Sequence, residues 1–241
     1  MKLRLRDRIL WGLFISGEGA KACPSNKLWL WLPPQYSRKK YRLLVARLVR
    51  TGLVQQTVIE GKVNFRLTET GRKKLFASFP VLTVGGKTWD GFWRVAVFDI
   101  PESRRRVRDA LRRKLTKLGF GRLQNSIYLS AYDWPETVLS KEVMLLEAKQ
   151  KHLGDPKTLA KRIWPLNQLS AVYKQTVERL TTLLGIKEEG KREEFLKKLH
   201  RDFLETLAAD PLLPPELLAA DWPGNKARLF LLRAGAVRGT N

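Results

Sequence analysis

Apolar positions recur at helical spacing in two stretches near the N-terminus. Between residues 3 and 17, one side of the predicted helix carries Leu5, Ile9, Leu10 and Leu13. After Ser37, apolar residues stand at i, i+3, i+4 and i+7 as far as Gly52, and they are Tyr41, Leu44, Val45 and Leu48. Ser37 is a favourable N-cap residue. The pattern therefore predicts helices over 3–17 and 37–52.

A short apolar run and a hairpin pattern surround the second predicted helix. Residues 26–32 read NKLWLWL and stop at two prolines, which indicates a strand or a short buried helix with Trp29 and Trp31 in the core. Runs at 53–58 and 63–67 flank Ile59-Glu60-Gly61-Lys62 and predict a β-hairpin. Its alternating residues Val63, Phe65 and Leu67 are expected on one buried face.

The middle of the chain alternates between strand and helix patterns. Residues 93–100 predict a buried strand, and a helix follows Pro101 and ends at Gly119, a residue suited to a left-handed cap. The expected core stripe of this helix is Val107, Ala110, Leu111, Leu115 and Leu118. Residues 123–130 predict a second strand and 143–148 a third. This order suggests a ferredoxin-like unit.

The last third of the chain carries mainly helical patterns. Helices are predicted over 157–164, 166–184 and 191–209, followed by proline-rich turns and a final apolar stretch over 227–237. We therefore predict an α+β protein of three domains. These are a winged helix-turn-helix over 1–80, a ferredoxin-like domain over 88–150 and a helical domain over 151–241.

The charge of the chain indicates what kind of partner it binds. The 241 residues include 46 Lys and Arg against 23 Asp and Glu, a formal net charge of +23. Residues 1–80 carry 17 basic and 4 acidic side chains, residues 81–134 carry 11 and 5, and the remainder 18 and 14. A polyanion, most simply DNA, is expected to meet the N-terminal third. The alternative is a basic surface that only keeps the protein soluble.

The candidate DNA-contacting side chains lie on the second predicted helix and on the hairpin. A recognition helix points its first turns at base edges, and a wing contacts the neighbouring backbone. The candidates are Ser37, Arg38, Lys39, Lys40, Arg42, Arg47, Lys62 and Arg66. The alternative is a small helical domain whose basic face is merely solvated.

The residues available for other chemistry are few. Cys23 is the single cysteine, and His152 and His200 are the only histidines, both expected at the surface. Neither an internal disulfide nor a Cys/His zinc cluster can form. No run reaches the roughly 20 apolar residues that cross a bilayer. We expect a cytoplasmic protein that requires no metal or cofactor and is not an enzyme.

Two sequence blocks resemble the phenylacetic acid degradation repressor (PaaX) family of transcriptional regulators. The first block contains Trp89-Asp90-Gly91, Phe98-Asp99-Ile100-Pro101-Glu102, the segment 108–115, Leu118-Gly119-Phe120-Gly121 and Gln124-Asn125-Ser126. The second contains the segment 210–218 and Asp221-Trp222-Pro223-Gly224, preceded by similar residues at 159–164 and 169–173. The departure from the family lies at 37–52, which is more basic than the family's usual second helix.

The resemblance implies a winged-helix domain, a ferredoxin-like domain and a helical domain. It also implies a homodimer that binds double-stranded promoter DNA as a repressor and is released by an acyl-CoA effector. The central domain of the family is similar to the small metal-dependent nuclease of CRISPR adaptation, in which an aspartate ends the first strand, and Asp99 matches that position. Two such carboxylates across a dimer could hold Mg²⁺ and activate water, which makes a nuclease the alternative function.

Asp99 and the following arginines also have plainer interpretations. A carboxylate before a helix commonly accepts hydrogen bonds from the helix N-terminal amides or pairs with arginine, and that is the preferred interpretation of Asp99. The basic side of the helix after Pro101 could bind DNA backbone or an effector phosphate, through Arg104, Arg105, Arg108 and Arg112. A solvated face partly neutralised by Glu102 and Asp109 is the alternative.

Overall fold

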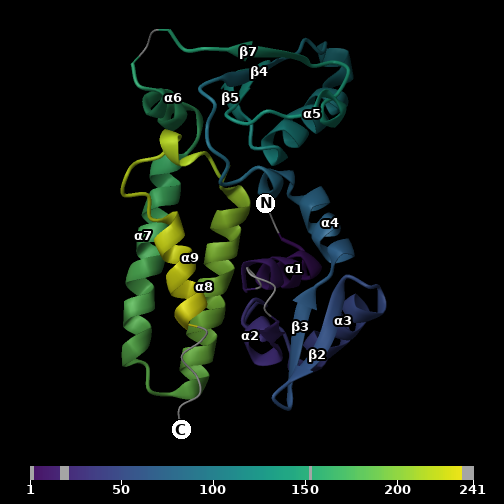
Figure 1. The fold of residues 1–241 in the computed structure, drawn as a ribbon, viewed down its shortest axis with the longest axis vertical. Coiled ribbons are helices and arrows are strands. Elements are labelled where there is room, and N and C mark those ends of the chain that lie inside the picture. The colour runs from purple at the N-terminus through teal and green to yellow at the C-terminus, as the bar shows by residue number, and fades with distance from the viewer. Residues whose placement is uncertain (1–2, 17–21, 152–153, 235–241) are drawn as a thin grey trace. The chain divides into compact units, whose positions relative to one another are not determined.

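The structure, a computed structural model, describes residues 3–16, 22–151 and 154–234 (Figure 1). It is a mixed α+β fold with two antiparallel sheets. The chain divides into two compact units, and each is built from separate stretches of sequence. The first contains Met1–Ser78, Ser170–Ala209 and Pro223–Asn241, and the second contains Phe79–Leu169 and Asp210–Trp222. The division into three domains stays a prediction.

The N-terminal part of the first unit combines four helices with a three-stranded sheet. Its elements in chain order are α1 (Leu5–Ser16), β1 (Cys23–Pro24), α2 (Ser25–Trp29), α3 (Arg38–Arg50), β2 (Val54–Ile59), β3 (Lys62–Leu67) and α4 (Glu69–Ser78). Both predicted helices are confirmed, and the run at 26–32 forms the short buried helix α2 and the turn after it. Trp29 and Trp31 are buried in the core, as predicted. The sheet order is β1-β3-β2.

The β2–β3 hairpin closes through a two-residue turn. Ile59 pairs with Lys62, and the two residues between them, Glu60 and Gly61, have φ angles of 50° and 70°. Positive φ at both positions defines a type I′ turn, whose twist matches that of the strands. The predicted hairpin is confirmed. Its predicted face is wrong at Val63, which is 41% exposed, because β1 pairs with β3 only at Asn64 and Phe65 and the tip extends beyond that cover.

Helix α8 (Glu189–Ala209) completes the core of the first unit against α1 and α2. Arg8 of α1 is buried, and its guanidinium lies 2.7 Å from the Glu205 carboxylate. The rings of Trp31 and His200 meet edge to face at 4.5 Å. His200 is only 3% exposed, so its predicted surface position is wrong. Because the helical stripe of α8 meets α2, His200 falls on the buried side. His152 lies outside the described residues.

Two further helices of the C-terminal region flank α8 in sequence. Helix α7 runs over Leu166–Thr182, close to its predicted bounds, and α9 runs over Gly224–Ala234 and contains the described part of the final apolar stretch. Tyr173 of α7 packs its ring against Phe203 of α8 at 6.0 Å, and Arg179 pairs with Asp202 at 2.8 Å. The end of the final predicted stretch, 235–237, lies outside the described residues. The helical prediction for the C-terminal region is confirmed in the described part.

The second unit places one long helix against a four-stranded antiparallel sheet. Its elements are β4 (Trp93–Val97), α5 (Arg105–Lys117), β5 (Gly121–Gln124), β6 (Ile127–Ser130), β7 (Met144–Ala148) and α6 (Pro156–Ile163). The strand order is β5-β6-β4-β7. The run expected as one strand over 123–130 is part of a hairpin that turns at Asn125-Ser126. Between β6 and β7 the chain forms a 3-10 turn, Glu136–Val138, where a complete ferredoxin-like unit has a second helix.

The core of the second unit lies between α5 and the sheet. Leu111 and Leu115 of α5, with Leu118 just after it, pack against Phe98 and other buried residues, including Ala96, Phe120, Tyr128 and Tyr132. The predicted stripe is correct at these three leucines and wrong at Val107 and Ala110, which are exposed. Both lie in the first two turns of α5, and the core cluster begins only at Leu111. Gly119 ends the helix with a φ of 83°, as predicted.

Candidate nucleic-acid interface

Helix α3 presents six basic side chains and no acidic one. Its N-cap is Ser37, whose Oγ accepts a hydrogen bond from the Lys40 amide at 3.3 Å, as predicted. The apolar face buries Tyr41, Val45 and Leu48 and half-buries Leu44 and Val49, so the other positions face outward. The exposed basic residues are Arg38, Lys39, Lys40, Arg42, Arg47 and Arg50.

An apolar side chain stands in the middle of this basic surface. Leu43 is 64% exposed and lies on the helix side opposite Tyr41, Val45 and Leu48. Sequence reasoning did not select it, although a leucine outside the apolar stripe of an otherwise basic helix was a visible signal. Exposure of a large apolar residue among cations suits contact with a surface that is both anionic and partly apolar, such as base edges in a groove.

Most of the predicted cations of α3 make no contact that neutralises them. Within the described part of the chain, the side chains of Lys39, Lys40, Arg42 and Arg47 form no ion pair or side-chain hydrogen bond. Arg38 is different, because it pairs with Glu193 of α8 at 3.1 Å. The predicted residues of this helix are therefore brought together on one exposed surface, and one of them is shared with α8.

The hairpin carries the other two predicted cations. Lys62 is exposed beside the turn, and the Arg66 Nε donates to Gln55 Oε1 across the two strands at 2.8 Å. Three apolar side chains at the tip are also exposed, namely Val58, Ile59 and Val63. Helix α3 contacts β2, and Figure 1 shows both beside each other. The hairpin thus extends the basic surface of α3 with a mixed basic and apolar tip.

A compact charged cluster joins α8 to the start of α3. The Trp29 indole N–H donates to Glu193 at 2.7 Å, and Lys197 Nζ lies 3.4 Å from the same carboxylate and 3.6 Å from the centre of the Trp29 ring. Lys197 is buried, and burial lowers the pKa of its ammonium while Glu193 opposes that shift. Burial also opposes ionisation of Glu193. Nevertheless the Trp29 hydrogen bond and the charges of Arg38 and Lys197 hold the pKa of this carboxyl below its usual range.

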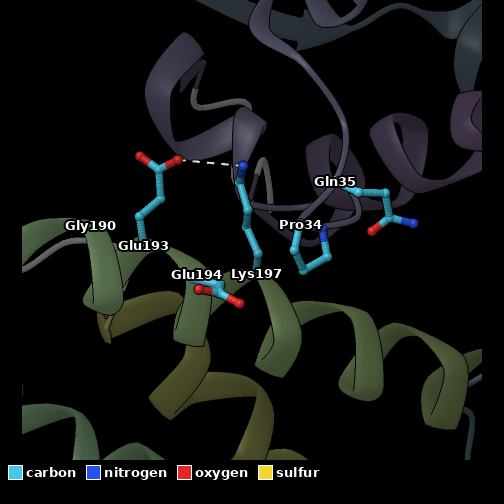
Figure 2. Close-up of a pocket in the computed structure, with 6 residues that line it drawn as sticks. All are labelled: Pro34, Gln35, Gly190, Glu193, Glu194 and Lys197. Atoms are coloured by element: carbon cyan, nitrogen blue, oxygen red, sulfur yellow. Dashed lines mark ion pairs between the residues drawn. The ribbon is translucent and has the colours of Figure 1, made fainter.

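A polar pocket of about 450 Å³ opens beside this cluster (Figure 2). Pro34 and Gln35 line it from the segment before α3, and the α8 residues Gly190, Glu193, Glu194 and Lys197 line it from the other side. The Glu193 carboxylate lines this pocket and is partly exposed, whereas Lys197 stays buried.

The predicted sites of the second unit are Asp99 and the arginines around α5. Asp99 is exposed, and its side chain makes neither a helix-capping hydrogen bond nor an ion pair with any described residue. Among the described residues, no group of three or more His, Cys, Asp or Glu side chains is arranged to hold a metal ion.

Arginines of the α5 region pair with carboxylates: Arg104 with Glu142 at 3.2 Å, Arg105 with Asp109 at 3.8 Å, Arg108 with Glu102 at 2.6 Å and Arg112 with Asp109 at 4.0 Å.

The block around Trp89, which resembles the PaaX family, stabilises the fold of the second unit. Arg94 is buried in β4 and pairs with Asp90 at 2.6 Å and with Glu147 of β7 at 3.2 Å. Asp90 also accepts a hydrogen bond from the Phe92 amide, and the Trp89 indole donates to the Phe92 carbonyl. The hydrogen bond to Arg94 is the main cause that lowers the pKa of Asp90. This block fixes the start of the central strand.

Two protein-family models match the middle and the last third of the sequence. Residues 86–160 match the PaaX protein central Cas2-like domain, and residues 164–237 match the PaaX-like protein C-terminal domain. No curated protein matches the chain. A solved structure, the uncharacterized protein Rv0674 from Mycobacterium tuberculosis, is similar at 21% identity with a TM-score of 0.59, covering 95% of this chain and 92% of that one. None of the described helices is both long and apolar enough to cross a membrane. The two matched domains together span more than half of the sequence, and the chain belongs to the PaaX family.

Proposed function

We propose that this protein is a sequence-specific, DNA-binding transcriptional regulator whose N-terminal residues form a winged helix-turn-helix. The order helix, strand, helix, helix, hairpin in residues 5–67 supports this proposal. In such a domain the helix before the hairpin enters the major groove, and the hairpin contacts the flanking backbone. Family membership supports a regulator over an enzyme.

The single observation that carries the proposal is the exposed surface of α3. Four cations that pair with no described carboxylate surround the exposed Leu43, and they are Lys39, Lys40, Arg42 and Arg47. Arg and Lys can contact phosphates or guanine edges, and an apolar side chain can contact the methyl group of thymine. We assign direct base contacts to Leu43 and Arg42, and backbone contacts to Lys62 and Arg66 of the hairpin.

The finer features of the proposal follow the family resemblance. We propose a cytoplasmic homodimer that acts as a repressor and is released by an acyl-CoA. The effector phosphates would meet α5, where Arg106 and Arg113 are exposed and the neighbouring arginines already have carboxylate partners. Exchange of carboxylate for phosphate on arginine is chemically straightforward, because both anions accept paired N–H groups.

The test is a titration of the purified protein with duplex DNA from upstream of its own gene and with a mixed-sequence duplex, over a salt series. We expect tighter binding to the upstream duplex and affinity that falls as salt rises. Arg42→Ala should weaken binding and reduce the difference in affinity between the two duplexes, because it removes an assigned base contact. The matched control is Lys161→Ala, which removes an exposed cation from α6. Equal affinity for both duplexes, or equal effects of the two variants, would reject the assignment.

The nuclease alternative is tested in the same samples. Incubation of the DNA with Mg²⁺ is compared for the natural protein and for Asp99→Ala. Cleavage that is lost in the variant would establish hydrolysis by the second unit. Cleavage that persists in the variant would remove Asp99 from consideration.

A further inference from the structure

Arg38 is the first residue of α3 and is held by α8 from the opposite end of the sequence. Its Nη2 donates to Glu193 Oε2 at 3.1 Å, and its guanidinium carbon lies 4.5 Å from the centre of the Trp29 ring. The Arg38 side chain is nevertheless 55% exposed. It is thus oriented by α8 and still open to solvent.

The carboxylate that holds Arg38 is itself fixed by other contacts. Its second oxygen, Oε1, receives the Trp29 indole N–H at 2.7 Å and lies 3.4 Å from the Lys197 ammonium. The Glu193 side chain is only 25% exposed, and Lys197 is buried. A carboxylate with this many donors keeps its position and its negative charge whether or not Arg38 stays beside it.

We propose that Glu193 is a positioning residue for DNA binding, whose carboxylate orients Arg38 and competes with a DNA phosphate for it. The inference rests on the proposed function. An ion pair with an exposed arginine is weak, so a phosphate can displace the carboxylate from Arg38. Glu193 belongs to the segment that matches the PaaX-like C-terminal domain. The C-terminal region therefore sets the strength of the N-terminal DNA contact.

This arrangement predicts that one substitution increases the affinity for DNA. Loss of a structural contact generally weakens binding, but loss of the competing charge in Glu193→Gln should strengthen it. The amide oxygen can still accept the Trp29 hydrogen bond, so the change is mainly electrostatic. We expect affinity for the upstream duplex to rise about two- to fivefold, the range set by the strength of an exposed ion pair. The slope of log affinity against log salt should change little, because Arg38 contacts the same phosphate in both proteins.

The experiment compares DNA titrations of the full chain, Glu193→Gln, Arg38→Ala and the double variant, over the same salt series. Glu194→Gln is the matched control, because it removes the same charge one residue away, from a carboxylate that pairs with Lys198 at 3.0 Å. The gain should be present in Glu193→Gln, absent in Glu194→Gln, and absent when Arg38 has been replaced. Urea unfolding of each variant verifies that it is folded.

Glu193→Gln leaves the Lys197 ammonium buried without its carboxylate, which can destabilise the fold. If that variant fails to fold, the combined change Glu193→Gln with Lys197→Met removes both charges and keeps an apolar chain over Trp29. The inference is overturned, and the proposed function is left standing, if a folded Glu193 variant binds DNA no tighter than the natural protein. The same holds if the gain persists without Arg38. Absence of any complex with the natural protein refutes the proposed function, and the inference with it.

Discussion

The buried histidine of α8 makes the stability of the protein sensitive to mild acid. His200 lies against Trp31, and its Nδ1 is 2.7 Å from the Leu196 carbonyl, so the neutral ring carries its proton on that nitrogen. Burial lowers the pKa of this imidazole from 6.5 to about 4, and the contact with the carbonyl opposes the shift only in part. The unfolded chain therefore binds a proton more readily than the folded one as pH falls below 6.5.

The size of the effect follows from these two pKa values. The contribution is fully present above pH 6.5 and is lost as pH falls towards 4. With a folded pKa of about 4 and an unfolded value of 6.5, the free energy of unfolding should drop by about 2 kcal/mol between pH 7 and pH 5. Carboxylates with lowered pKa values, such as Asp90 and Asp202, lose their contribution only below their ordinary values near pH 4. The difference in the free energy of unfolding between pH 7 and pH 5 therefore excludes the contribution of these carboxylates and reports on His200.

The assay is urea unfolding followed by tryptophan fluorescence at pH 7 and pH 5, for the natural protein and for His200→Leu. Leucine is uncharged and fills a similar apolar space, so most of the loss between the two pH values should disappear. An NMR titration of the ring protons should show no protonation of His200 above about pH 5 in the folded protein. A loss of the same size in His200→Leu, or a ring that titrates near pH 6.5, would refute this account.

Three further changes test local geometry through the free energy of unfolding in urea. Gly71→Ala should cost about 3 kcal/mol, because its Cβ would stand 2.0 Å from the Leu53 carbonyl oxygen, whereas Gly190→Ala meets open space and should be neutral or slightly stabilising. Glu60→Asn should stabilise the hairpin by up to about 1 kcal/mol, since asparagine tolerates a φ of 50° better; a loss would argue against the type I′ turn. Ser37→Ala should cost about 1 kcal/mol and Ser37→Asp should restore most of it, unless the cap bond does not form.

The sequence predicts local elements well where a repeated apolar pattern meets a suitable capping residue. The helix after Ser37 is an example, because its cap and its apolar stripe both agree with the structure. The hairpin at 54–67 was also predictable from local sequence, because the turn residues Glu60-Gly61 separate two strand-like runs. These features depend on neighbours within a few positions.

Features that depend on distant partners were not predictable from one sequence. His200 looked like a surface residue, because nothing near it in the chain reveals that Trp31 covers it. Val63 and Val107 fit apolar patterns, yet the elements that would bury them end earlier. The basic surface of α3 was predicted as a group of residues, but the assignment of Arg38 to a carboxylate 155 positions away required the fold.

The contribution of α8 to the N-terminal core constrains how the protein can be dissected. A truncated chain ending after α4 would keep α3 and the hairpin, yet it would lose His200 and Leu196, which pack on Trp31 and Leu30. Indole surface that is buried in the intact protein would then face water, and such a fragment should aggregate or fold only partially. Weak DNA binding by such a fragment would therefore reflect its incomplete fold and not the DNA affinity of α3 and the hairpin in the intact protein.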